Sequence, residues 1–166
     1  MDVEEIVSKT VINVERVDLA AMLSKKEYIQ KLSEICEINI SGVDVIRKNE
    51  QGCTIAYFTG EKPKLFLVIA YYPTPNWEEN YKYYKNHILK DKKVKNTIEK
   101  EDFGLGEKSI FFKAEFKNNG ETHNILSVFD STGQIQINAQ PFEGKILDFE
   151  KMKKTAELAM NAVSSD

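Results

Sequence analysis

Four side chains in this chain have the chemistry for nucleophilic or metal-binding work: Cys36, Cys53, His87 and His123. A thiol nucleophile needs a histidine base and an orienting acid within hydrogen-bond reach. Neither histidine belongs to a recognisable catalytic motif. The cysteines form no Cys-x-x-Cys pair, and two isolated histidines give little support for a zinc site. We therefore expect a non-enzymatic protein with no catalytic residue, no metal site and no cofactor.

The two cysteines have two possible states, which depend on the cellular compartment. As free thiols they would pack in the core as small apolar side chains. In an oxidising compartment Cys36 and Cys53 would form one disulfide, worth about 3 kcal/mol in the chain-entropy model. The residue pattern leaves both states open.

A Gly-x-Gly occurs in the stretch DFGLGEKSIFF, residues 102–112, and resembles a phosphate-binding loop. Such a loop needs a helix directly after the glycines, because the helix N-terminus supplies N–H donors and a positive dipole. Here Gly106 is followed by Glu107, which would repel phosphate, and then by a strand-forming run from Ser109. The pattern predicts a tight corner between two strands instead.

The composition is that of a globular domain. The chain has 166 residues with 23 basic and 26 acidic side chains, a balance that argues against a dedicated nucleic-acid binder. Lysines gather in residues 81–100, but that run contains no arginine and is interpreted as solvated charge. No apolar stretch reaches about 18 residues, and the acidic first ten residues do not resemble a signal peptide.

Three helices are expected from apolar side chains at helical spacing. The first runs from about Lys25 to Cys36, with Ser24 and Glu27 spaced as a capping box. The second follows Asn76 and places Trp77, Tyr81, Tyr84 and Ile88 on one stripe. The third runs from about Asp148, its expected cap, to residue 163. Residues 11–23 fit a short strand followed by the start of a helix, so we divide the chain into an N-terminal segment, 1–23, and one domain, 24–166.

Strand-like segments fill the remainder of the chain. About three lie between the first two helices, and three or four lie between the second and third helices, joined by tight turns. The segregation of strands from helices predicts an α+β domain with a mainly antiparallel sheet of about six strands flanked by three helices.

A binding surface is expected where polar or amphipathic side chains fall outside the core pattern. In the segment QIQINAQ the isoleucines alternate with Gln134, Gln136 and Asn138, which therefore share the other face of a strand. Tyr72 and Tyr83 also fall off the apolar stripes, and tyrosine rings suit contact surfaces. We predict that these five residues contribute to a solvated sheet face or a polar contact surface.

The order of several short segments resembles a known family. LSEIC, GCTIAYF, FGLGEKSIFF, ILSVFDSTGQIQI and KTAELAMNAV follow one another as in small bacterial lipoproteins and exported domains of the PsbP-like α/β/α-sandwich type. The resemblance covers about residues 24–163. Ser109 stands where that family usually has alanine, and the sequence carries no lipobox cysteine.

The resemblance implies a binding or accessory domain without catalytic residues. It implies the soluble part of an exported or lipid-anchored protein whose signal has been removed, with another protein or a small ligand as partner. Membrane contact would come only through a lipid anchor absent from this sequence, and no nucleic-acid partner is expected. The acidic N-terminus favours an alternative, a cytosolic protein-binding adaptor, chaperone or immunity-type protein.

Overall fold

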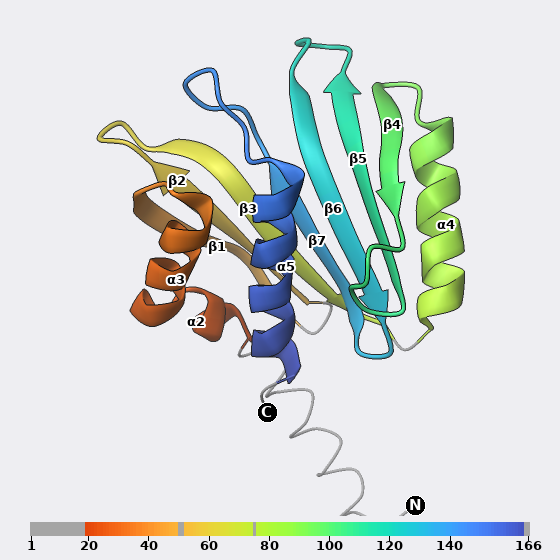
Figure 1. Cartoon of the computed structure of the whole chain (residues 1–166), viewed down its shortest axis with the longest axis horizontal. Coiled ribbons are helices and arrows are strands. Elements are labelled where there is room, and N and C mark those ends of the chain that lie inside the picture. Colours follow the sequence, from red (N-terminus) through yellow and green to blue (C-terminus); the bar gives the residue numbers. More distant parts are fainter. Residues whose placement is uncertain (1–18, 50–51, 75, 165–166) are drawn as a thin grey trace, which may run out of the picture.

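The computed structural model describes residues 19–49, 52–74 and 76–164 (Figure 1). It confirms a single α+β domain, with seven antiparallel strands in the order β1-β2-β3-β7-β6-β5-β4 rather than about six. The described helices are α2 (Leu19–Leu23), α3 (Lys26–Cys36), α4 (Trp77–Lys90) and α5 (Phe149–Ser164). The strands are β1 (Ile40–Asn49), β2 (Gly52–Thr59), β3 (Lys64–Pro73), β4 (Val94–Glu101), β5 (Lys108–Phe116), β6 (Thr122–Asp130) and β7 (Gly133–Ala139).

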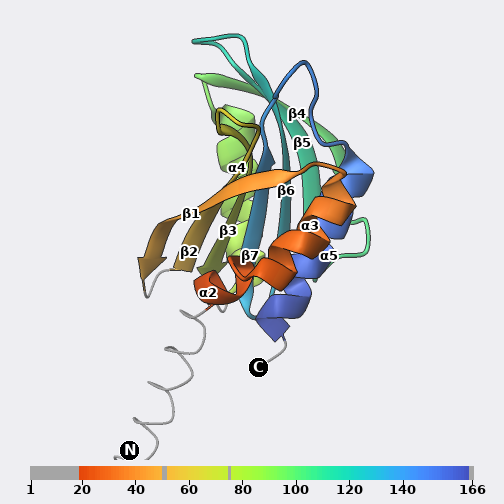
Figure 2. The ribbon, with the colours of Figure 1, turned by 90° about the vertical axis from the view of Figure 1, so that its left-hand side faces the viewer.

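The sheet is the middle layer of a sandwich. Helices α2, α3 and α5 cover one face, and α4 lies on the opposite face (Figure 2). The larger core cluster fills the space under α2, α3 and α5 and includes Leu32, Tyr57 and Met152. A smaller cluster between α4 and the sheet includes Tyr81 and Phe129. Both faces of the sheet therefore carry a core, which matches strands that are apolar on both sides.

The chain builds the sheet in two blocks. Strands β1, β2 and β3 are consecutive neighbours, and β4, β5, β6 and β7 form a second consecutive series. Helix α4 carries the chain from the centre of the sheet at β3 to its far edge at β4 (Figure 1). The two blocks join where β7 pairs with β3, at pairs such as Ile69 with Ile137.

The expected capping box at Ser24 is not formed. The N-cap of α3 is Lys25, which makes no side-chain capping hydrogen bond. The Ser24 hydroxyl instead donates to the carbonyl oxygens of Ala20 and Ala21, at 2.9 and 3.2 Å, and so satisfies the end of α2. Leu19, Ala20 and Leu23 are buried, so the packed domain reaches back before residue 24. The strand considered for residues 11–18 lies outside the described residues.

The caps expected at Asn76 and Asp148 and the corner expected at residues 102–112 are confirmed. The Asn76 side chain accepts a hydrogen bond from the Glu79 N–H, and Asp148 accepts one from the Lys151 N–H at 2.9 Å. The Gly-x-Gly stretch turns the chain from β4 into β5 without a helix. The Glu107 N–H at this corner donates to the Phe129 carbonyl oxygen at 2.8 Å, which ties the corner to β6.

Candidate binding face on the open half of the sheet

The face of the sheet that carries α4 consists of two different halves. Cross-strand neighbours on this face form rows, because successive side chains of a strand alternate between faces. The upper row is Asp44, Ala56, Val68, Asn138, Ile125, Phe112 and Ile98. The middle row is Arg47, Thr54, Ala70, Gln136, Ser127 and Ile110. The residues change from polar and small on β1, β2, β3 and β7 to mainly apolar on β6, β5 and β4.

Helix α4 lies over the apolar half. Its side chains Tyr81, Tyr84 and Ile88 pack on strands β4, β5 and β6. Phe129 is fully buried there, and its ring meets those of Tyr81 and Tyr84 edge-on at centroid distances of 5.3 and 5.4 Å. The stripe predicted for this helix therefore forms a core contact, as its spacing indicated.

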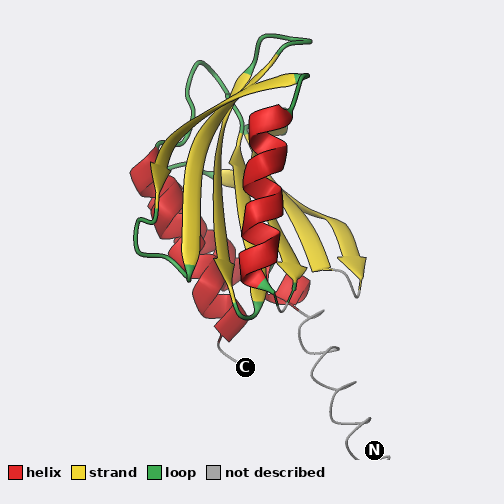
Figure 3. Ribbon diagram, turned by 90° about the vertical axis from the view of Figure 1, so that its right-hand side faces the viewer, coloured by secondary structure: helices red, strands yellow, loops and turns green. Residues whose placement is uncertain are grey.

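The polar half has no described helix over it, as the view from the α4 side shows (Figure 3). We call this half the open face. It consists of Arg47, Thr54, Ala56, Val68, Ala70, Tyr72, Gln134, Gln136 and Asn138. Four of the five residues predicted for a binding surface thus lie on this face: Tyr72, Gln134, Gln136 and Asn138. The intervening isoleucines of β7 enter the larger core.

Gln134, Gln136 and Asn138 form a ladder of polar side chains along β7, and two of them also hold α4 in place. Asn80 of α4 donates to Gln134 Oε1 at 3.3 Å. The Tyr84 hydroxyl donates to Gln136 Oε1 at 3.1 Å. Ser127 in turn donates to the Tyr84 hydroxyl at 2.9 Å, and burial raises the pKa of Tyr84. Gln134 is only 6% exposed. Gln134 and Gln136 therefore form a polar seam between helix α4 and the sheet. This differs from a solvated sheet face, which was one of the two expectations for these residues.

The open face holds polar atoms that lack partners, at Arg47 on the edge strand β1 and at Asn138 on β7. The guanidinium carbon of Arg47 lies 5.2 Å from the centroid of the Tyr72 ring. Arg47 Nε and Nη2 are buried, and so is Asn138 Oδ1, and none of the three has a hydrogen-bond partner in the described part of the chain. An unpaired buried polar group costs about 1–3 kcal/mol, so each calls for an explanation.

Tyr83 lies apart from the other predicted surface residues. It is 74% exposed on α4 and stacks with His87, with ring centroids 6.4 Å apart. Sequence spacing alone could not separate Tyr83 from the open face, because that separation depends on how α4 crosses the sheet.

The cysteines and histidines are not brought together. Cys36 and Cys53 are buried free thiols in the larger core, and Cys36 Sγ lies 3.8 Å from Thr155 Oγ1 of α5. His123 lies on the face of the sheet that carries α4. Its Nε2 is 3.1 Å from Glu121 Oε1, and its ring centroid lies 4.5 Å from that of Phe116. His87 lies on the outer surface of α4. This arrangement supports no thiol–histidine chemistry between the four residues.

We expect the native thiols to be unreactive. Burial raises the pKa of Cys36 from 9.0 to about 11, which lowers its thiolate fraction about 100-fold, and burial also raises the pKa of Cys53. The reaction of the folded protein with a chromogenic disulfide at pH 8 should be at least about 100-fold slower than that of the protein in urea. A fast-reacting thiol in the folded protein would contradict this packing and reopen a role for cysteine chemistry.

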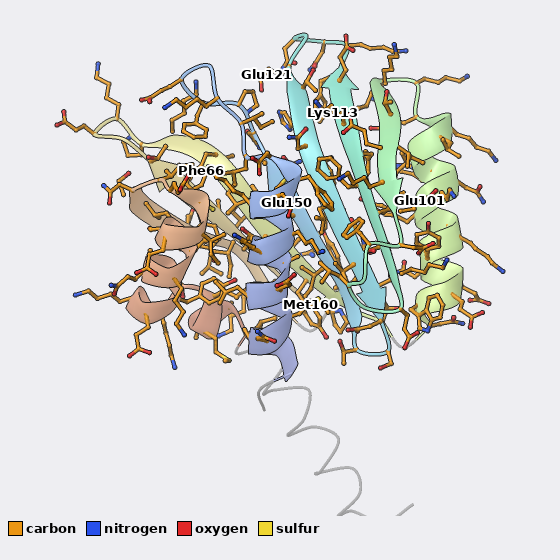
Figure 4. The ribbon with its side chains drawn as sticks, viewed as in Figure 1. Phe66, Glu101, Lys113, Glu121, Glu150 and Met160 are labelled. Carbon is orange, nitrogen blue, oxygen red and sulfur yellow. The ribbon has the colours of Figure 1, made fainter. Side chains whose placement is uncertain are left out.

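A cluster that sequence patterns missed links α4 to the edge strand β4 at Glu101 (Figure 4). Lys85 Nζ lies 2.7 Å from Glu101 Oε1, and the Tyr81 hydroxyl donates to the same oxygen at 2.6 Å. The hydrogen bonds from Lys85 and Tyr81 lower the pKa of Glu101 below its ordinary value of 4.5. The cluster is a structural tie, since its three groups satisfy one another.

The Glu101 cluster predicts a pH effect. Because the folded pKa is lowered, the carboxylate stabilises the fold above about pH 4.5 and loses this contribution as the pH falls through the folded pKa. The Glu101→Gln variant should therefore lose less stability than the wild type between pH 6 and pH 3 in urea titrations. With a side chain 34% exposed, the difference should stay below about 1 kcal/mol. Glu61→Gln, in the exposed β2–β3 turn, is the control and should follow the wild type.

A second surface lies on the face of the sheet that carries α2, α3 and α5, away from the open face. A groove of about 630 Å³ runs between strands β4, β5 and β6 and the connection from β7 to α5. Lys95, Glu99, Lys113 and Glu115 alternate in charge along it, and Lys113 Nζ lies 3.9 Å from Glu99 Oε1. Lys113 is labelled in Figure 4. Mixed charges of this kind protect an edge strand from pairing with other chains.

Within the described ranges, no group of three or more His, Cys, Asp or Glu side chains is placed to hold a metal ion. In the same residues, no helix combines the length and apolar character needed to cross a membrane. Comparison with protein-family models, curated proteins and solved structures found no match to this chain.

Proposed function

We propose that this protein is a non-catalytic binding or accessory domain, and that its open face receives a small ligand or a segment of another protein. The observation that carries the proposal is the set of buried, unpartnered polar atoms of Arg47 and Asn138 on a face that no described helix covers. A polar ligand that pairs with them would remove an energetic cost that the free protein bears. Thr54 and Ala70, which have small side chains, follow Arg47 in the same cross-strand row.

Chemical-shift mapping of the backbone amides tests this proposal. Capped dipeptides, short dicarboxylates and short diamides would be titrated separately into the labelled protein. We expect at least one of these probes to shift amides of β2, β3 and β7, including Thr54 and Gln136. The Thr54→Tyr variant, which fills the open face, should abolish the shifts. Thr122→Tyr, on the opposite face beside the groove, should preserve them.

Two results would count against the proposal. Shifts that map only to the groove around Lys113 would place binding on the opposite face of the sheet. Equal binding by wild type and Thr54→Tyr would show that the open face is not used. Both tyrosine variants need a melting temperature close to that of the wild type, so that a lost signal reports binding and not unfolding.

For the cellular placement we propose, from the PsbP-like resemblance, the soluble part of an exported or lipid-anchored protein. The alternative, a cytosolic adaptor, chaperone or immunity-type protein, is motivated by the acidic N-terminus and would keep Cys36 and Cys53 as free thiols. Alkylation of protein from its native cells, denatured without reductant, separates the two. Two alkylated thiols support the cytosolic placement, and a Cys36–Cys53 disulfide supports export.

A further inference from the structure

A bulge in the edge strand β1 places Arg47 on the open face. Val45 pairs with Ile55 and Arg47 pairs with Thr54, so Ile46 is the extra residue on β1. An extra residue shifts the alternation of side chains by one position. Arg47 therefore lies on the same face as Asp44, while the Ile46 side chain is 60% exposed.

The atoms of Arg47 that lack partners form one chemical unit. Nε and Nη2 are the two nitrogens on one edge of the guanidinium, and their N–H bonds point in parallel directions. Both are buried and lack a partner among the described residues, while the guanidinium carbon lies 5.2 Å from the centroid of the Tyr72 ring. Such an edge matches the two oxygens of a carboxylate, which it binds through two parallel hydrogen bonds.

The charge of this edge cannot be removed by proton loss. A guanidinium stays protonated in proteins, so a buried edge without a partner carries a desolvation cost. Asp44, in the next row on the same strand, is exposed and makes no ion pair with Arg47 within the described residues. A bound anion would meet this charge.

We infer that Arg47 anchors a carboxylate on the open face, held by its Nε and Nη2 edge above Tyr72. This inference rests on the proposed function and names the class of ligand. The remainder of the ligand lies over Thr54 and Ala70, which share the cross-strand row of Arg47.

Glutaramate, a five-carbon carboxylate with a terminal amide, and the neutral diamide glutaramide are matched probes for this site. At low salt, isothermal titration should show that glutaramate binds at least about tenfold more tightly than glutaramide. The Arg47 Nε–H signal should move downfield when glutaramate is added. The Arg47→Lys variant keeps the positive charge but loses the two parallel N–H donors of the guanidinium edge. It should weaken glutaramate binding by about tenfold or more. Lys62→Met, an exposed change in the β2–β3 turn, should leave binding unchanged.

Several outcomes would overturn the carboxylate inference. They are equal affinity for the acid and the diamide, an unchanged affinity in Arg47→Lys, or tighter binding of inorganic phosphate than of glutaramate. If Arg47→Lys folds poorly, the Nε–H signal of the wild type still decides, because an unmoved signal at saturating glutaramate rejects the contact. Neutral probes that still shift the open face would leave the proposed function standing while the carboxylate inference fails. The absence of any shift there would reject both.

Discussion

Replacement of Phe129 by alanine is expected to lower the free energy of unfolding by about 3–5 kcal/mol, among the largest single effects in this protein. Phe129 is fully buried at the centre of the smaller core. Its ring contacts Tyr81 and Tyr84, so its loss leaves a cavity and removes two aromatic contacts between β6 and α4. Urea unfolding followed by circular dichroism would measure the change.

The control for this prediction is an aromatic side chain on the outer surface of α4. Tyr83 is 74% exposed, and the Tyr83→Ala variant should change stability by no more than about 0.5 kcal/mol. If Phe129→Ala costs less than about 1 kcal/mol, α4 does not depend on the smaller core for its position. The seam formed by Gln134 and Gln136 would then have to hold the helix.

The two glycines of the β4–β5 corner should respond very differently to alanine. Gly104 has a φ of +89° and open space where a Cβ would lie, so Gly104→Ala should cost only the backbone strain, about 1–2 kcal/mol. At Gly106, with a φ of +59°, a Cβ would lie 2.6 Å from Val128 Cγ1 and 2.8 Å from the Phe129 carbonyl oxygen. Because backbone must move as well, Gly106→Ala should cost about 3 kcal/mol or more.

Each glycine serves as the control for the other, since both lie in one corner and both adopt positive φ. Parallel urea titrations of the two variants give the difference directly. Equal losses of stability would mean that backbone conformation alone requires the glycines. A larger loss at Gly106 would show that this corner is fastened to β6, where the Glu107 N–H reaches the Phe129 carbonyl oxygen.

Features that depend on nearby residues could be predicted well from the sequence. The stripe of α4, its Asn76 cap and the alternation in β7 follow from helix and strand periodicity, which short segments carry by themselves. Ser24 was misread because two helix ends compete for it. Its spacing to Glu27 fits a cap for α3, but its hydroxyl binds the end of α2. A local motif does not show which of two adjacent helix ends will use it.

The candidate site was only partly predictable. Periodicity places Gln134, Gln136 and Asn138 on one face. Whether α4 covers that face depends on where the connection from β3 to β4, which contains α4, crosses the sheet. Arg47 was missed because the bulge at Ile46 reverses the alternation of β1, and bulges leave little trace in the residue pattern. The unpartnered state of its guanidinium edge appears only once all three strands around it are in place.

The single junction between β3 and β7 has a consequence for how this chain folds. Within each block the strands that pair follow one another, so their pairing closes short loops and can form early. At the junction Tyr71 meets Ile135 across all of α4, β4, β5 and β6, and closing so long a loop costs chain entropy before any contact offsets it. We expect the pairing of the two half-sheets to be the slow step of folding. The open face, with Thr54 and Ala70 on one side of the junction and Gln134 and Gln136 on the other, forms only when β3 pairs with β7.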